Sequence, residues 1–250
     1  MSEDTVRANR AVWESASRKH VREYETLLAE ARTGLALTAA EREMLGPILQ
    51  RRPTVVHLQS GHGLDDVALV KFGAARVIGV DYSTVAVSAA ARRADELGMP
   101  CAYVAAQLPP APLRDSCADL VYTGKGALIW MPDLVAWARD VVRLVTRGGH
   151  LFVHEAHPMV PLYSWDTDRT SIRPDRRYFD HAHVNDSFPA HGAVEWQWTL
   201  GEVITVVVQA GLRVLELREH PEPFWRAGGI DAAAWNGHLP NTFSLLAQRP

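Results

Sequence analysis

Short apolar runs alternate with amphipathic segments along most of this chain, starting at Thr54. Residues 55–58 form an apolar run typical of a parallel strand buried on both faces, and residues 64–72 carry apolar side chains at helical spacing. The same alternation continues in strands expected at 76–81, 101–106, 119–123 and 150–157, and in helices expected at 84–97 and 134–145. Because strands that alternate with helices form parallel βαβ units, the pattern predicts an α/β fold.

The two ends of the chain and one internal stretch depart from this pattern. Residues 1–50 are expected to form an N-terminal helical lid, with helices at 3–28 and 38–50, and residues 51–250 the main domain. Residues 158–198 are rich in aromatic side chains and prolines, and a connection this long within a compact domain is usually functional. We expect these residues to form a cap inserted after the fifth strand. A helix at 199–210 and strands at 213–219 and 243–248 complete the chain.

The turn after the first strand indicates a nucleoside site. Small residues in the segment from Gln59 to Gly63 allow the backbone to approach a ligand, and Asp81 follows at the end of the next strand, where a carboxylate can bind a ribose diol. Asp65 and Asp66 lie where a pyrophosphate would bind, and two carboxylates would repel it. A cofactor without phosphates, such as S-adenosylmethionine (SAM), therefore fits better than a nicotinamide dinucleotide.

Several segments carry a family resemblance. They are HLQSGHG at 57–63, GALIWMPDL at 126–134, RGG at 147–149 and LPNTFSLLAQRP at 239–250. They resemble class I SAM-dependent methyltransferases, and more narrowly a bacterial small-molecule branch whose first motif is of the HLQ type. The resemblance implies a Rossmann-like, doubly wound, seven-stranded sheet with an antiparallel last strand. His57 and Gln59 depart from the commoner family pattern, which has an acid and a glycine at these positions.

The resemblance also implies which residues contact SAM and its product S-adenosylhomocysteine. Asp81 is expected to bind the ribose, Tyr82 to lie against the adenine, and Trp13 to face the methionine end from the lid. The full expected set comprises Trp13, Gln59, Ser60, Gly61, Asp81, Tyr82, Ala106, Gln107, Leu108, Thr123 and Gly124.

Candidate catalytic residues lie at the end of the fifth strand and in the cap. Strand alternation places Glu155 and His157 on one side, where they can act as a base or orient a nucleophile. The alternatives are that Glu155 caps a loop or pairs with an arginine, and that His157 with Pro158 forms only a turn. His181 is a further candidate base. The His181-x-His183 spacing lacks further metal-ligand signature, so we expect solvated loop histidines and no metal.

Substrate contacts are expected from the loop after the fourth strand and from the aromatic side chains of the cap. The candidate residues are Lys125, Trp130, Tyr178 and Trp196. An aromatic cap of this kind is suited to closing over a small apolar or planar molecule.

Composition excludes several other classes of protein. The net charge of −3 over 250 residues gives no electrostatic footprint for nucleic acid. Hydrophobic content of 47% is ordinary for a globular domain, and no apolar run is long enough to cross a membrane. Cys101 and Cys117 show no metal or redox spacing. We therefore expect a cytoplasmic protein, monomeric or homodimeric, that acts on a small molecule without nucleic-acid or membrane partners.

The function predicted from the resemblance is methyl transfer from SAM to O, N or C of a small, aromatic or natural-product-like molecule, as in secondary metabolism. One alternative is a protein of the same fold that binds SAM without transferring the methyl group, such as a cyclase or a scaffold. An NAD(P)-dependent oxidoreductase is less favoured, because the G-x-G-x-x-G turn is missing and the chain ends in a late strand pair.

Overall fold

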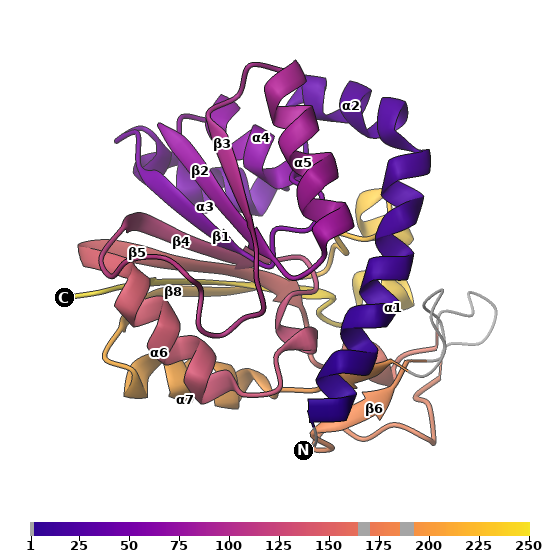
Figure 1. Cartoon of the computed structure of the whole chain (residues 1–250). Coiled ribbons are helices and arrows are strands. Elements are labelled where there is room, and N and C mark those ends of the chain that lie inside the picture. The colour runs from indigo at the N-terminus through magenta and orange to yellow at the C-terminus, as the bar shows by residue number, and fades with distance from the viewer. Residues whose placement is uncertain (1–2, 165–170, 186–192) are drawn as a thin grey trace.

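A seven-stranded mixed sheet with strand order β3-β2-β1-β4-β5-β9-β8 forms the centre of the protein (Figure 1). The computed structural model describes residues 3–164, 171–185 and 193–250. The strands of the sheet are β1 Thr54–Leu58, β2 Arg76–Asp81, β3 Cys101–Ala105, β4 Ala118–Gly124, β5 Val145–Ala156, β8 Arg213–His220 and β9 Thr242–Gln248. The first five are parallel, whereas β9 lies antiparallel between β5 and β8. This arrangement confirms the predicted doubly wound sheet with an antiparallel last strand.

Helices cover both faces of this sheet. On one face, α3 Ala39–Leu49 and α4 Leu64–Lys71 pack on side chains that include Val55 and Leu120. On the other face, α6 Leu134–Leu144 and α7 Leu200–Gln209 pack on Val56 and Val121. Successive residues of β1 and β4 therefore point to opposite faces, and both are buried, as the unbroken apolar runs predict.

The N-terminal helices differ from the sequence prediction in one respect. A single helix was expected over 3–28, but the structure has α1 Glu3–Arg22 and α2 Tyr24–Thr33, separated by a change of direction at Glu23. No glycine or proline marks this break; instead, Leu27 and Ala31 of α2 pack against the start of α4, and this packing decides the direction. The capping box predicted for the next helix, Thr38 with Glu41, is confirmed at the start of α3.

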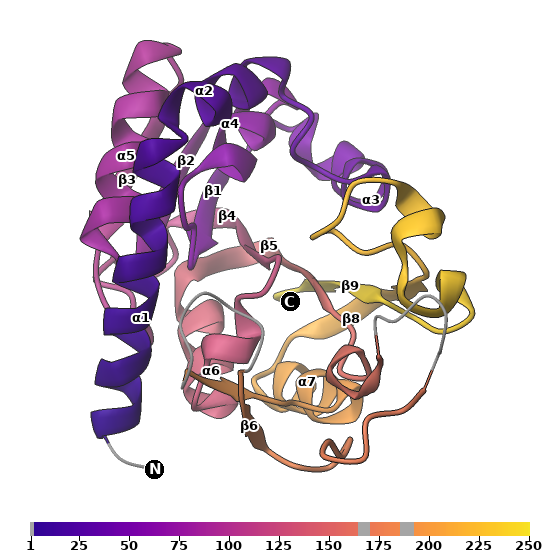
Figure 2. The same ribbon diagram turned by 90° about the vertical axis from the view of Figure 1, so that its right-hand side faces the viewer.

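The long helix α1 lies across the side of the sheet where the parallel strands end. It packs along α5 Thr84–Glu96, which begins at the predicted N-cap Ser83. Figure 2 shows α1, the cap and the 221–240 segment arranged around these strand ends. Within the cap, β6 Ala182–Val184 and β7 Val194–Trp196 form an antiparallel hairpin that the sequence did not indicate.

Two hydrogen bonds attach the cap to α1. The Asn9 side-chain amide donates to the Val194 carbonyl at 2.7 Å and accepts from the Val194 N–H at 3.0 Å. Short 3₁₀ helices complete the connections around the strand ends, at Leu128–Trp130, Val160–Leu162, Gly229–Ala232 and Ala234–Gly237.

Candidate functional site

The turn after β1 contains a non-glycine residue in the left-handed region. Gln59 has φ 60°, a conformation that costs an L-residue about 1 kcal/mol relative to glycine. Its side-chain Nε2 donates to the Ala127 carbonyl at 2.8 Å, which connects the turn to the loop after β4. The other amide atom, Oε1, is buried and has no hydrogen-bond partner among the described residues. The turn therefore holds a buried acceptor that lacks a partner, in a residue that also lines a cavity.

Asp81 ends β2 directly beside this turn. Its Oδ2 accepts a hydrogen bond from the Gly61 N–H at 3.0 Å, and its Oδ1 accepts one from the Ser83 N–H at 2.8 Å. Burial raises the pKa of the Asp81 carboxyl, and the two backbone hydrogen bonds partly offset this rise. Because each carboxylate oxygen can accept two hydrogen bonds, both oxygens keep a lone pair for a ligand.

His57, which departs from the commoner motif, and the two acids of the first turn all have partners within the protein. His57 Nδ1 lies 2.6 Å from Asp66 Oδ1, and both side chains are buried. Burial lowers the pKa of His57, but the charge and hydrogen bond of Asp66 outweigh it, so the pKa is raised. Asp65 is bonded to the Lys125 ammonium. Both acids of the first turn are thus used within the protein.

Lys125 is held by three acceptors. Besides Asp65, its Nζ bonds the Ala36 carbonyl at 2.7 Å and lies 3.4 Å from Glu41 Oε2. Burial lowers the pKa of Lys125, while Asp65 and Glu41 raise it by more, so the ammonium stays charged. Lys125 was expected to contact substrate; in the structure its ammonium is directed to these acceptors.

Two adjoining cavities lie at the strand ends, each with a volume of about 380 Å³. We call the first the Asp81 chamber, since Asp81 lies in it with Gln59 and Gly61. We call the second the Glu155 chamber, since Glu155 lies in it with several aromatic side chains. The two chambers share part of their lining, namely Trp13, Lys125, Gly126, Trp130 and Phe224. The chambers therefore meet at the loop after β4 and at the inner side of α1.

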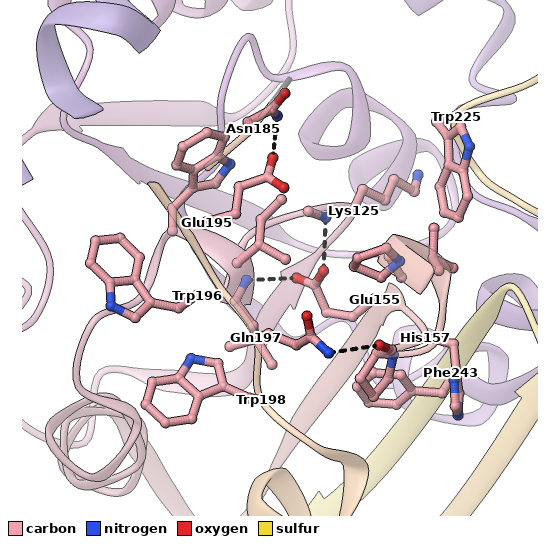
Figure 3. Close-up of a pocket in the computed structure, with 18 of the residues that line it drawn as sticks. Lys125, Glu155, His157, Asn185, Glu195, Trp196, Gln197, Trp198, Trp225 and Phe243 are labelled. Carbon is pink, nitrogen blue, oxygen red and sulfur yellow. Dashed lines mark hydrogen bonds between the residues drawn. The ribbon is translucent and has the colours of Figure 1, made fainter. Parts of the chain in front are cut away.

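Glu155 occupies the base of its chamber and holds the loop after β4 (Figure 3). Its carboxylate accepts hydrogen bonds from the backbone N–H groups of Gly126 at 2.9 Å, Ala127 at 2.7 Å and Leu128 at 3.0 Å. Burial raises the pKa of Glu155 to about 7, against the opposing effect of these bonds. The geometry matches the loop-capping alternative for this residue.

The two other candidate bases lie in different surroundings. His157 lines the Glu155 chamber, but its Nδ1 accepts from the Met159 N–H at 3.2 Å and its Nε2 lies 2.9 Å from Glu219 Oε1. Burial lowers the pKa of His157, and Glu219 only partly offsets this. His181 is 70% exposed and lines neither chamber, with Nδ1 3.7 Å from Glu202.

The expected cofactor residues fall into two groups. Those lining the Asp81 chamber are Trp13, Gln59, Ser60, Gly61, Asp81, Tyr82 and Gly124. Gln107 and Leu108 instead line a small cavity of about 20 Å³ beside Tyr82. Ala106 and Thr123 line neither chamber; Ala106 donates its N–H to the Asp81 carbonyl, and Thr123 is fully buried.

Of the expected substrate residues, Trp130 and Trp196 line the Glu155 chamber and Tyr178 does not. Tyr178 packs with Leu162 and Tyr163 at the base of the cap. Sequence reasoning missed Glu195, Asn185 and Phe243 in this chamber. It also expected solvated loop histidines, whereas the His183 side chain is only 10% exposed, because the unpredicted hairpin places it opposite Glu195.

The described residues contain neither a metal-binding cluster nor a membrane-spanning helix. In residues 3–164, 171–185 and 193–250, no group of three or more His, Cys, Asp and Glu side chains is arranged to hold a metal ion. Across the same residues, every helix is too short or too polar to cross a membrane.

An open α/β sheet with a ligand cavity beyond its carboxyl edge, next to Asp81, is the architecture of nucleoside-binding enzymes. Residues 55–149 match a family model described as a methyltransferase domain. No curated protein matches the chain.

Solved structures match at high coverage. A SAM-dependent methyltransferase from Mesorhizobium loti is 23% identical with a TM-score of 0.65, over 81% of this chain and 96% of that one. A putative SAM-dependent methyltransferase from Listeria monocytogenes is 17% identical with a TM-score of 0.63, over 83% and 99%. The cyclase SpnF is 16% identical with a TM-score of 0.55, over 83% and 80%. The resemblance to class I SAM-dependent methyltransferases is therefore confirmed, and the chain has the fold of that class.

Proposed function

We propose that this protein transfers a methyl group from SAM to a small molecule. The observation that carries the proposal is the Asp81 chamber, which is lined by Asp81, Gln59 and Gly61 and shares part of its lining with an aromatic second chamber. The Asp81 oxygens suit the ribose hydroxyls of SAM. Gln59 Oε1 suits its ammonium, in place of the acid found at residue 57 in most of the family.

When bound, SAM supplies a methyl group activated by its sulfonium. The chain's own residues position the two reactants and exclude water, which accounts for much of the rate in a displacement of this kind. Glu155 fixes the loop that separates the chambers, through its three backbone hydrogen bonds. The Glu155 chamber presents Trp130, Trp196 and Phe243, which suit an apolar or planar acceptor.

Calorimetric titration with SAM and S-adenosylhomocysteine tests the cofactor assignment. Asp81→Ala removes an acceptor for two ribose hydroxyls, and hydrogen bonds to a charged group contribute about 1.5–3 kcal/mol each, so affinity should fall by roughly 10²–10⁴-fold. Glu25→Ala, an exposed acid on α2, is the control and should leave affinity unchanged. If the wild type and Asp81→Ala bind SAM equally well or equally poorly, the proposal is wrong.

A transfer screen with tritiated methyl groups then separates an enzyme from a binding protein. Label should move from SAM to phenols, amines or activated carbon acids of a small-molecule panel. Tight SAM binding with no transfer to any class of acceptor would favour the cyclase or scaffold alternative.

A further inference from the structure

Aromatic side chains form much of the wall of the Glu155 chamber. Those that line it and are half-buried or exposed include Trp13, Trp130, Trp198, Phe224 and Trp225. Trp13 and Trp130 also line the Asp81 chamber, and their ring centroids are 6.0 Å apart at an interplanar angle of 44°. The place where the two chambers meet is therefore bordered by aromatic rings.

Acidic side chains join these rings in the lining. Glu195 of β7 lines the chamber with a side chain that is 15% exposed, and Glu155 lies at its base. Asn185 Nδ2 donates to Glu195 Oε1 at 2.5 Å, so a neutral amide fixes this carboxylate (Figure 3). Lys125 also lines the chamber, but its ammonium is bonded to two acids that lie outside the lining. Its positive charge is therefore already balanced.

This combination of aromatic rings and a carboxylate favours a cation. The face of an aromatic ring attracts positive charge through its quadrupole, and the attraction is strongest where water is excluded. The Glu195 carboxylate adds a Coulombic attraction that acts without direct contact. The same charge repels a ligand that carries a carboxylate or a phosphate. The chamber therefore suits a molecule with an apolar body that is positively charged or becomes so in the reaction.

The titratable side chains of the described lining have partners of their own. Glu155 accepts three backbone hydrogen bonds, and His157 has a partner at each ring nitrogen. His183 Nε2 lies 3.1 Å from Glu195 Oε2, across the cap hairpin. These contacts support the walls of the chamber, and an acceptor that attacks without losing a proton leaves all of them in place.

We propose that the methyl acceptor is an uncharged nitrogen without a hydrogen, in a tertiary amine or an aromatic heterocycle on an apolar body, and that Glu195 selects for it; this inference rests on the methyl-transfer function proposed above. The lone pair of this nitrogen forms the bond to the methyl carbon. The C–S bond breaks, and its electron pair remains on sulfur. No proton moves, and the positive charge passes from sulfur to nitrogen. The product is an N-methylated cation among the aromatic rings, beside the Glu195 carboxylate.

A matched pair of ligands tests the selection for positive charge. N-methylisoquinolinium and 2-methylnaphthalene have nearly the same shape and differ in charge. Tryptophan-fluorescence titration of the protein loaded with S-adenosylhomocysteine should give about 10-fold tighter binding of the cation, as expected of desolvated cation–π contacts. Glu195→Gln keeps the shape of the side chain and removes its charge, so this preference should fall by roughly 3–10-fold. The control is Glu25→Gln on α2, which should match the wild type.

Single-turnover transfer of a tritiated methyl group compares the two kinds of acceptor atom. Isoquinoline and 2-naphthol are similar in size, but isoquinoline offers a ring nitrogen without a hydrogen, whereas 2-naphthol offers a hydroxyl. Label should pass to isoquinoline at least about 10²-fold faster, because the hydroxyl needs a positioned base.

Three results would overturn the proposal. They are equal or weaker binding of the cation than of its neutral counterpart, an unchanged preference in Glu195→Gln, and equal or faster transfer to 2-naphthol. Wild-type protein that fails to bind SAM contradicts the proposed function instead. If SAM binds and label passes to neither probe, the cyclase or scaffold alternative is favoured, and the ligand pair decides whether the chamber selects a cation.

Discussion

Replacing Glu155 with glutamine should change how the stability of the protein depends on pH. Burial raises the pKa of Glu155 from its ordinary value of 4.5 to about 7. The folded chain therefore binds this proton more tightly than the unfolded chain. The stability that the group contributes is fully present below pH 4.5, and it is lost as the pH rises through about 7.

The magnitude follows from the two pKa values. Their separation, from 4.5 to about 7, corresponds to about 3 kcal/mol at 1.36 kcal/mol for each pKa unit. Most of this stabilisation is lost between about pH 5 and pH 8. Over that range we expect the free energy of unfolding of the wild type to decrease by about 2–3 kcal/mol relative to that of Glu155→Gln, in which residue 155 cannot titrate. Urea unfolding of both proteins at several pH values measures the difference, and all other titrating groups cancel.

Glu25→Gln controls for the general loss of one negative charge, since Glu25 is exposed on α2. The reasoning fails if the difference between wild type and Glu155→Gln is constant across this pH range to within about 0.5 kcal/mol, the scatter expected of additive mutations. It also fails if the wild type gains stability relative to the variant as the pH rises, because that sign belongs to a carboxyl whose pKa is lowered by folding.

Two further predictions concern the turn after β1. His57→Leu or Asp66→Leu alone leaves a buried partner unpaired and should cost about 3–5 kcal/mol in urea unfolding, whereas the double variant should recover much of this loss; additive losses would contradict a direct pair. Gly63→Ala should destabilise the fold by roughly 1–3 kcal/mol, because its φ is 78° and the new Cβ would lie 2.5 Å from a tyrosine hydroxyl. Gly61→Ala also places alanine at a positive φ, 54°, which should cost about 1 kcal/mol of stability, but its Cβ meets no protein atom within 4 Å and should in addition weaken SAM binding, measured by calorimetry; equal effects of the two alanines on affinity would contradict the cavity assignment.

The sheet could be predicted from the sequence because its signal is local. Each strand from β1 to β4 is a short apolar run bounded by turn residues, and each helix between them has its own periodicity, whereas β5 begins at Val145, before the strand start expected at residue 150. The break at Glu23 could not be predicted, because it depends on the packing of Leu27 and Ala31 against α4 rather than on any residue at the break.

The same distinction applies to the candidate site, where residues placed by local sequence could be predicted and residues placed by packing could not. Asp81 and Gly61 were found because they occupy fixed places in one βαβ unit, and their side chain and backbone meet in the structure. The cap residues were harder to place, because the pairing of two short strands, which opposes His183 to a residue 12 positions further on, decides which histidine is buried. His183 and His181 are two residues apart in the sequence, yet the register with Glu195 buries the first and leaves the second exposed.

The structure also changes which argument favours a phosphate-free cofactor. Repulsion of a pyrophosphate by Asp65 and Asp66 is weaker than the sequence suggests, because one acid is paired with His57 and the other with Lys125. Gln59 supplies a stronger argument. Glycine would adopt φ 60° without strain, whereas the Gln59 side chain offsets its strain by donating from Nε2 to the Ala127 carbonyl, and its Oε1 is buried without a partner among the described residues. Under the proposed function, an amide oxygen at that place would suit a cationic group such as an ammonium better than a phosphate.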